Sequence, residues 1–136
     1  MSEAPDFAAP VERTLDAALG FETLEVTPEH ARSRVPVSDA LKQPYGLVHG
    51  GVLAALAESL ASRATMAGVY ADGNIAVGLS NHTSFMRPVL EGYVNASARR
   101  VHHGSTTWVW EVELTDDQGR LCALSRVTMA VRPART

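Results

Sequence analysis

The feature that most constrains this fold is one long run of helix-forming residues, 51–70, in a chain of 136 residues. Its larger apolar residues recur at helical spacing and predict a buried stripe made up of Leu53, Leu56, Ala57, Leu60, Ala64 and Ala67. The neighbouring stripe has small side chains apart from one carboxylate, and its members are Gly51, Ala54, Ala55, Glu58, Ser62 and Thr65. Small side chains let another backbone or a ligand come close. The rest of the chain is therefore expected to cover this helix.

The segments on either side of the helix predict strands. Two short runs, Phe21–Val26 and Ala31–Val37, flank the turn TPEH before the helix. After it the pattern has period two, which places four apolar side chains on one strand face: Trp108, Trp110, Val112 and Leu114. Further strands are expected over residues 75–85, 93–101 and 121–131. A short helix over residues 11–18 ends at Gly20, and residues 1–10 are expected to form a loose arm.

These elements predict one α+β domain spanning residues 1–136, in which about six antiparallel strands wrap one long central helix.

A net charge of −3 argues against a general nucleic-acid binder, because phosphate binding needs a basic surface. Cys122 is the only cysteine, so no internal disulfide forms. The N-terminus lacks a basic segment followed by an apolar one, and Glu58 and Arg63 interrupt the apolar helix. We expect a cytoplasmic protein without a membrane partner.

The start of the long helix carries His49, Gly50 and Gly51. The first amides of a helix have no internal partner, and the helix dipole adds partial positive charge there. Because glycine has no Cβ, a ligand oxygen can reach these N–H groups. A phosphate loop would add a Lys and a Ser or Thr, whereas Val52 and Leu53 follow here. The pattern therefore favours a carbonyl that becomes an oxyanion.

Glu58 lies eight residues after Gly50, which places the two about 12 Å apart along the helix axis. They cannot both touch one carbonyl from the same helix. Either they serve different purposes, or two copies of the helix pass each other and each site takes one group from each subunit. The stripe of small residues favours the second interpretation. It predicts an obligate dimer with two equivalent sites.

The segment KQPYGLVHGGVLAALAES resembles the hotdog-fold acyl-CoA thioesterases, in the branch with a catalytic Glu on the central helix. The resemblance extends from TLDAALGF through SNHTSFMRPV and GSTTW to GRLCALS, which is nearly the whole chain. It is strongest toward the 4-hydroxybenzoyl-CoA thioesterases, followed by the 1,4-dihydroxy-2-naphthoyl-CoA hydrolases. HGG alone is a weak signal, but Gln43 before it and Glu58 after it at this spacing make it specific.

The resemblance implies a role for each matched residue. The Gly50 N–H would polarise the thioester carbonyl, supported by Gln43 and His49. Glu58 of the facing subunit would act as a nucleophile or as a base on water, and Ser62 would orient Glu58 or the water. Contacts to the CoA portion are expected from Arg87, Ser105, Thr106 and Arg135, and a contact to a ring hydroxyl is expected from Asp16.

The resemblance implies hydrolysis of an aromatic acyl-CoA, with 4-hydroxybenzoyl-CoA favoured. It implies no cofactor and no metal, since CoA is part of the substrate, and a tetramer built from two dimers. A 1,4-dihydroxy-2-naphthoyl-CoA or phenylacetyl-type CoA hydrolase is the alternative within this class.

Two other classes stay open. A hotdog enoyl-CoA hydratase would use His49 beside the carboxylate. A non-catalytic acyl-CoA-binding module would tolerate the substitution Glu58→Ala. His49 is also expected to serve as a structural hydrogen-bonding group, and the adjacent His102 and His103 point to opposite strand faces, which disfavours a metal site there.

Overall fold

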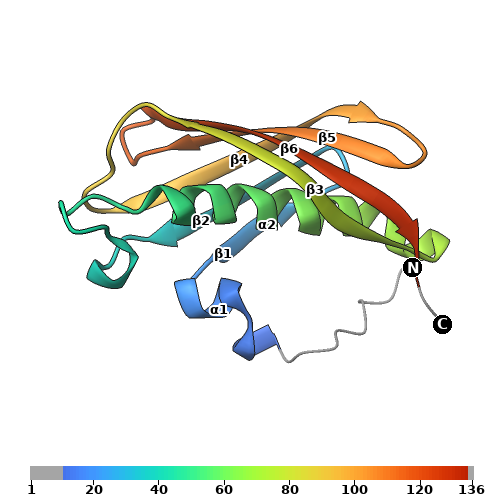
Figure 1. Ribbon diagram of the computed structural model, residues 1–136, viewed down its shortest axis with the longest axis horizontal. Helices are drawn as coiled ribbons and strands as arrows, with labels where there is room; N and C mark the ends of the chain where they lie inside the picture. The colour runs from blue at the N-terminus through green and yellow to red at the C-terminus, as the bar shows by residue number, and fades with distance from the viewer. Residues whose placement is uncertain (1–10, 135–136) are drawn as a thin grey trace.

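The computed structural model describes residues 11–134. One long helix lies across a curved six-stranded antiparallel sheet, as the sequence predicts (Figure 1). The helices are α1 (Leu15–Leu19) and α2 (Gly50–Val69), with short 3₁₀ turns at Val11–Arg13, Asp39–Leu41 and Tyr70–Asp72. The strands are β1 (Glu22–Val26), β2 (His30–Pro36), β3 (Asn74–Phe85), β4 (Tyr93–His103), β5 (Thr107–Thr115) and β6 (Leu121–Pro133). Their order, β1-β2-β4-β5-β6-β3, places β1 and β3 at the two edges.

The predicted short N-terminal helix is present but interrupted. A 3₁₀ turn at Val11–Arg13 precedes α1, because Thr14 adopts an extended backbone and caps α1 by accepting a hydrogen bond from the Ala17 N–H at 3.4 Å. Gly20 ends α1 in the left-handed conformation with φ 83°, as the sequence indicates. The predicted arm over residues 1–10 lies outside the described residues.

The helix α2 begins at Gly50, one residue before the predicted start. His49 is its N-cap and accepts a hydrogen bond from the Gly51 N–H on Nδ1 at 2.8 Å. By length and composition alone, the segment Gly50–Asp72 is apolar enough to cross a bilayer, with a mean hydropathy of 1.2. Half of that window is buried inside the protein, and a buried core helix of a globular domain can have the same length and apolar composition.

The buried face of α2 is wider than the predicted stripe, because the sheet wraps around the helix. Thr65, which we expected on the small-sided stripe, is fully buried; it donates to the Ala61 carbonyl at 2.8 Å and accepts from Trp110 Nε1 at 2.9 Å. Ala67, which we expected in the buried stripe, is exposed. Both assignments were wrong, since helical spacing gives the direction of a side chain but not the extent of the layer that covers it.

The predicted apolar face of β5 is confirmed. Its four side chains are all at most 3% exposed, namely Trp108, Trp110, Val112 and Leu114. Gly68 lets α2 approach this face, because a Cβ there would overlap the Trp108 ring and lie 3.1 Å from the Cβ of Pro28. At this point of the core the helix backbone therefore packs directly against an indole ring.

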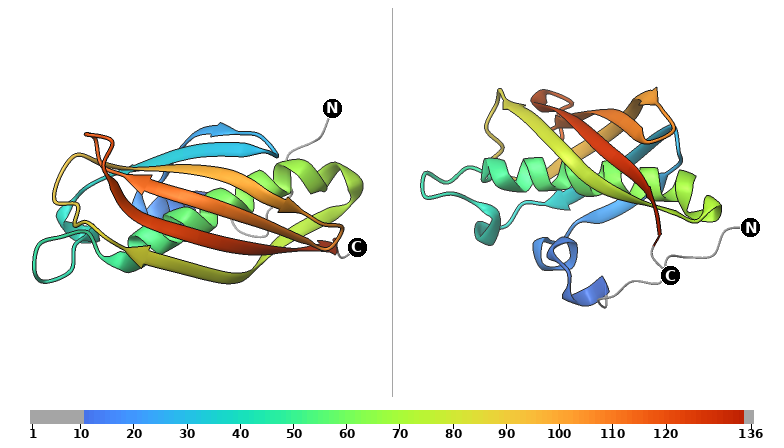
Figure 2. Two further views of the ribbon diagram at one scale, coloured as in Figure 1. Left: turned by 90° about the horizontal axis from the view of Figure 1, so that it is seen from above. Right: turned by 45° about the vertical axis from the view of Figure 1, so that its right-hand side comes forward.

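The edge strand β3 pairs only with β6 within the described chain. It is 12 residues long, with a bulge between Gly78 and Ser80. Three large apolar side chains on it are about half exposed: Val77, Leu79 and Phe85. A long edge strand with exposed apolar residues is a surface that another chain can extend or cover. Figure 2 shows β3 along one border of the sheet, beside α2.

Candidate active site

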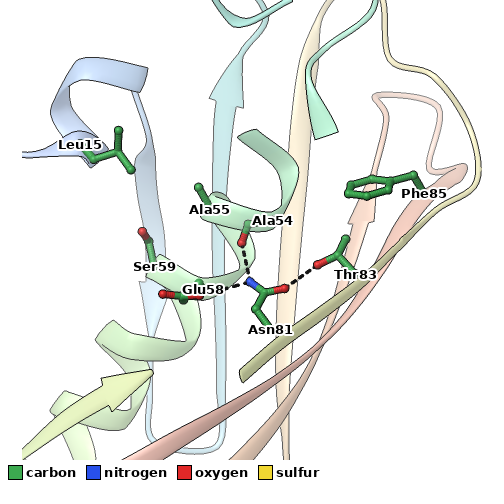
Figure 3. A pocket seen from close by; sticks show the side chains of 8 residues that line it. All are labelled: Leu15, Ala54, Ala55, Glu58, Ser59, Asn81, Thr83 and Phe85. Carbon is green, nitrogen blue, oxygen red and sulfur yellow. Dashed lines mark hydrogen bonds between the residues drawn. The ribbon is translucent and has the colours of Figure 1, made fainter. Parts of the chain in front are cut away.

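A cavity of about 460 Å³ opens over the exposed side of α2, between α1 and β3 (Figure 3). Its floor is formed by Ala54 and Ala55, and Leu15 of α1 stands on one side. The β3 side chains Asn81, Thr83 and Phe85 stand on the other, with Glu58 and Ser59 farther along the helix. This volume is within the range of small-molecule sites, and the small floor residues that the sequence singled out do line it.

Glu58 points from α2 toward β3. A Cβ on Gly78 would lie 3.2 Å from its Oε2, so the missing side chain at this position leaves room for the carboxylate. On the other oxygen, Oε1, Glu58 accepts a hydrogen bond from Asn81 Nδ2 at 3.4 Å. Among the described residues the side-chain donor to Glu58 is Asn81 of β3, in place of the hydrogen bond expected from Ser62. Ser62 as the residue that orients a water stays a prediction.

Asn81 belongs to a polar group that sequence reasoning missed. Its Nδ2 also donates to the Ala54 carbonyl at 2.9 Å, and its Oδ1 accepts from the Thr83 hydroxyl at 2.6 Å. Thr83 in turn lies 2.5 Å from the hydroxyl of Ser125 on β6. The available signal was the alternation of Asn81, Thr83 and Phe85, which places all three on one face of β3.

The start of α2 offers one unpaired amide. The Gly51 N–H donates to His49 Nδ1, and the Val52 N–H donates to the His49 carbonyl at 2.9 Å. No hydrogen bond among residues 11–134 uses the N–H of Gly50. The Phe85 ring lies over this glycine, where an added Cβ would be 3.0 Å from ring carbons. Gly50 can therefore present its N–H to a ligand oxygen beside an aromatic ring.

His49 and Gln43 support this end of the helix through backbone contacts. Because His49 Nδ1 accepts the Gly51 N–H, that nitrogen carries no proton in this arrangement. Gln43 Oε1 accepts the backbone N–H of Tyr45, which stabilises the loop leading to the helix. The carboxamide Nε2 of Gln43 keeps its two donor hydrogens, which suits a polarising contact.

The described residues that were expected to contact CoA lie at opposite ends of the sheet. Arg87 is exposed just after β3, close to the end of the sheet where α2 begins. Ser105 and Thr106 are exposed in the β4–β5 turn at the opposite end of the sheet (Figure 1). Arg135 lies outside the described residues. One chain alone therefore provides only part of the predicted binding surface.

Asp16 lies at the border of the cavity, where it joins α1 to α2. It accepts hydrogen bonds from Ser59 Oγ at 2.7 Å and from an Arg63 Nη at 3.1 Å. Both carboxylate oxygens thus have partners within the chain. A contact from Asp16 to a ring hydroxyl, as predicted, would have to share these oxygens.

Other reactive side chains lie away from the cavity. Cys122 is fully buried, and desolvation raises the pKa of its thiol, so it stays protonated and is a poor nucleophile. His102 and His103 are exposed at the end of β4, and His103 packs edge-on against Trp108. Within residues 11–134, no three His, Cys, Asp or Glu side chains gather in a group that could hold a metal ion.

Comparison with known proteins adds to this geometry. Residues 45–123 match the Thioesterase superfamily. The protein Rv1847 of Mycobacterium tuberculosis is 37% identical over 99% of both chains. The 1,4-dihydroxy-2-naphthoyl-CoA hydrolase of Escherichia coli is 38% identical over 83% of this chain and 77% of its own.

A solved structure shares the architecture as well. A variant of the thioesterase PA1618 from Pseudomonas aeruginosa, 35% identical, superposes with a TM-score of 0.86 and covers 90% of this chain and 88% of its own. The family match covers more than half of the chain, and these relatives exceed 30% identity over most of it. The chain therefore belongs to the thioesterase superfamily, with the hotdog fold, and is a thioester hydrolase.

Proposed function

We propose that this protein hydrolyses an aromatic acyl-CoA to the free acid and CoA. In this proposal Glu58 is the nucleophile or the general base on water, and the Gly50 N–H polarises the thioester carbonyl. The observation that carries it is that α2 presents an accessible carboxylate in the cavity and, about two turns earlier, an amide that has no partner among the described residues. A thioester is already an activated acyl group, so one carboxylate and one oxyanion donor suffice.

The active site is shared between two subunits. Gly50 and Glu58 are about 12 Å apart along α2, and the CoA-contacting candidates lie at opposite ends of one sheet. The exposed apolar side chains on β3 supply a surface through which a second copy can approach. A two-fold axis there brings Glu58 of one subunit toward Gly50 of the other. Association of two such dimers into a tetramer is the expectation from the family resemblance.

The lining of the cavity supports a flat acyl group. Ala54 and Ala55 form a floor without bulky side chains, and Leu15 and Phe85 add apolar surface on two sides. Within the aromatic class the sequence resemblance favours 4-hydroxybenzoyl-CoA. The Escherichia coli relative, a 1,4-dihydroxy-2-naphthoyl-CoA hydrolase, supports the alternative acyl group. Both esters therefore belong in the test.

The hydratase alternative requires His49 as a proton carrier. Its Nδ1 is occupied as the cap of α2, which supports hydrolysis over hydration. Crotonyl-CoA separates the two, because hydration consumes the double bond without releasing a free thiol.

The test measures kcat/KM with a thiol reagent for 4-hydroxybenzoyl-, 1,4-dihydroxy-2-naphthoyl-, phenylacetyl-, acetyl- and palmitoyl-CoA. We expect turnover that is fastest with the aromatic esters. Glu58→Gln should reduce kcat by about 10²–10⁴-fold, since it removes the carboxylate but keeps the shape. Glu113→Gln on the exposed face of β5 is the matched control and should leave kcat unchanged. Failure to hydrolyse any of these esters, or full activity of Glu58→Gln, would contradict the proposal.

A further inference from the structure

Three polar side chains from two strands form a continuous line that ends at Glu58. Ser125 of β6 is 1% exposed and lies 2.5 Å from the Thr83 hydroxyl. Thr83 donates to Asn81 Oδ1 at 2.6 Å, and Asn81 Nδ2 reaches Glu58 Oε1 at 3.4 Å and the Ala54 carbonyl at 2.9 Å. Figure 3 shows Asn81 between Thr83 and the helix.

The hydrogen bonds in this line have one consistent direction. A threonine hydroxyl has a single proton, and Thr83 donates it to Asn81 Oδ1. Ser125 must then be the donor to Thr83. The amide of Asn81 is thereby oriented with its oxygen toward Thr83 and its NH₂ toward α2. The opposite orientation would place the amide oxygen against the Ala54 carbonyl and the Glu58 carboxylate. Three acceptors would then face one another without a donor between them, which is unfavourable.

We propose that Asn81 is a positioning residue for Glu58 and that Thr83 and Ser125 set its orientation. This inference rests on the proposed function, in which Glu58 is the catalytic carboxylate. The Asn81 NH₂ donates to Oε1 and thereby fixes the direction of the carboxylate. Oε2, beside Gly78, is then the reacting oxygen. It either forms an anhydride with the acyl group as the C–S bond breaks and CoA leaves as a thiolate, after which water hydrolyses the anhydride, or it takes a proton from the water that attacks the carbonyl and displaces the thiolate.

Ser125, the first residue in this line of hydrogen bonds, is buried. Ser125 is enclosed by the sheet, so rotation of its hydroxyl away from Thr83 would leave a desolvated polar group unpaired. Asn81 is also tied to the backbone of α2 through Ala54. The donor to Glu58 is therefore oriented by the fold before any ligand binds, as preorganised catalytic groups require.

Charged groups on the surrounding elements are already paired or face elsewhere. On α1 and α2, Asp16 is paired with Arg63. On β3 and its neighbour β6, His82 and its register partner Arg126 lie on the sheet face opposite Asn81. On β1 and β2, Glu22 is paired with Arg34 and Glu25 with Arg32. An extra negative charge at position 81 would therefore act on Glu58 without a neutralising partner on these elements.

The first experiment uses the near-isosteric change Asn81→Asp. It replaces the donor facing Glu58 Oε1 with an oxygen, and two adjacent carboxylates disfavour ionisation of both. We expect the acidic limb of the pH profile of kcat/KM for 4-hydroxybenzoyl-CoA to move to higher pH by about one unit. A residue with only a structural role would not move this limb.

The second experiment uses a matched pair at Thr83. Thr83→Val removes the hydroxyl at nearly constant volume and leaves Asn81 Oδ1 without its donor, which loosens the amide and should lower kcat about tenfold with KM unchanged. Thr83→Ser keeps the hydroxyl and should retain wild-type kcat. Thr128→Val makes the same exchange on β6, away from this line of hydrogen bonds, and serves as the control that should leave kcat unchanged. Thermal melting of all variants confirms that each is folded.

Each outcome decides the proposal. An unshifted pH profile in Asn81→Asp, a wild-type kcat in Thr83→Val, or a loss in Thr83→Val that Thr83→Ser shares overturns the positioning role. If Thr83→Val does not fold, the pH profile of Asn81→Asp decides by itself. Glu58→Gln tests the proposed function separately. If Glu58→Gln is inactive, the proposed function holds even when the positioning role of Asn81 is overturned. If Glu58→Gln is active, both the proposed function and this inference are wrong.

Discussion

Three glycines determine which side chains reach α2. Gly50 lies under the Phe85 ring, Gly68 lies under Trp108, and Gly78 faces the carboxylate of Glu58. None of the three has a positive φ, so the backbone conformation does not require glycine. What each position requires is space. At Gly50 and Gly78 this space belongs to the candidate active site, and at Gly68 it belongs to the core.

Gly68→Ala tests the requirement for space in the core. The added methyl would overlap the Trp108 ring, so we expect the free energy of unfolding to fall by about 1–3 kcal/mol, as for other overpacked sites. Trp108→Phe in the same chain removes the overlapping part of the ring. The loss measured by chemical denaturation should therefore be smaller than the sum of the two single losses. Simple additivity would show that the two side chains do not compete for this space.

At the scale of elements, the short helix α1 lines one side of the cavity and depends on α2 for its position. A helix of five residues has little stability of its own, so its position depends on its contacts. Asp16 provides two of them by accepting from Ser59 and Arg63 of α2. These contacts place Leu15, which is 61% exposed, along the cavity.

Asp16→Ala distinguishes this structural role from the predicted contact to a ring hydroxyl. If Asp16 holds α1 in place, kcat/KM should fall about tenfold for both benzoyl-CoA and 4-hydroxybenzoyl-CoA, with acetyl-CoA little affected. A direct contact to the hydroxyl would instead penalise only 4-hydroxybenzoyl-CoA. Asp39→Ala, at a fully exposed carboxylate, is the control.

At the scale of the whole molecule, the proposed dimer divides each site between two chains. The unpaired Gly50 N–H and the Glu58 carboxylate lie on the same helix but about two turns apart. The edge strand β3, with Leu79 56% exposed, runs beside both. The proposed dimer completes each site with a group from the other chain.

Mixed dimers test this directly. We expect Glu58→Gln and Gln43→Ala each to inactivate both sites of their own dimers, whereas a mixed dimer would contain one intact site. Unfolding and refolding an equal mixture should therefore restore about a quarter of wild-type activity. Analytical ultracentrifugation confirms that dimers have reformed. A mixture that stays inactive although dimers form would show that each chain works alone.

Much of the fold was predictable from local patterns. The period of α2 and of β5 and the glycine after α1 are properties of neighbouring residues, so they predicted the elements to within a few residues. The spacing between Gly50 and Glu58 is likewise fixed by helical rise. The sequence by itself also identified the small-sided floor of the cavity, through Ala54 and Ala55.

Only the tertiary structure decided which distant residues meet at that floor. Asn81 and Ser125 are far apart along the chain and are linked by Thr83 because β3 pairs with β6 in a defined register. Asp16 joins Ser59 only because α1 folds back onto α2. Thr65 is buried and Ala67 is exposed because the sheet curves around the helix. Periodicity describes the direction of a side chain within its own element, whereas strand order and register decide what lies in that direction.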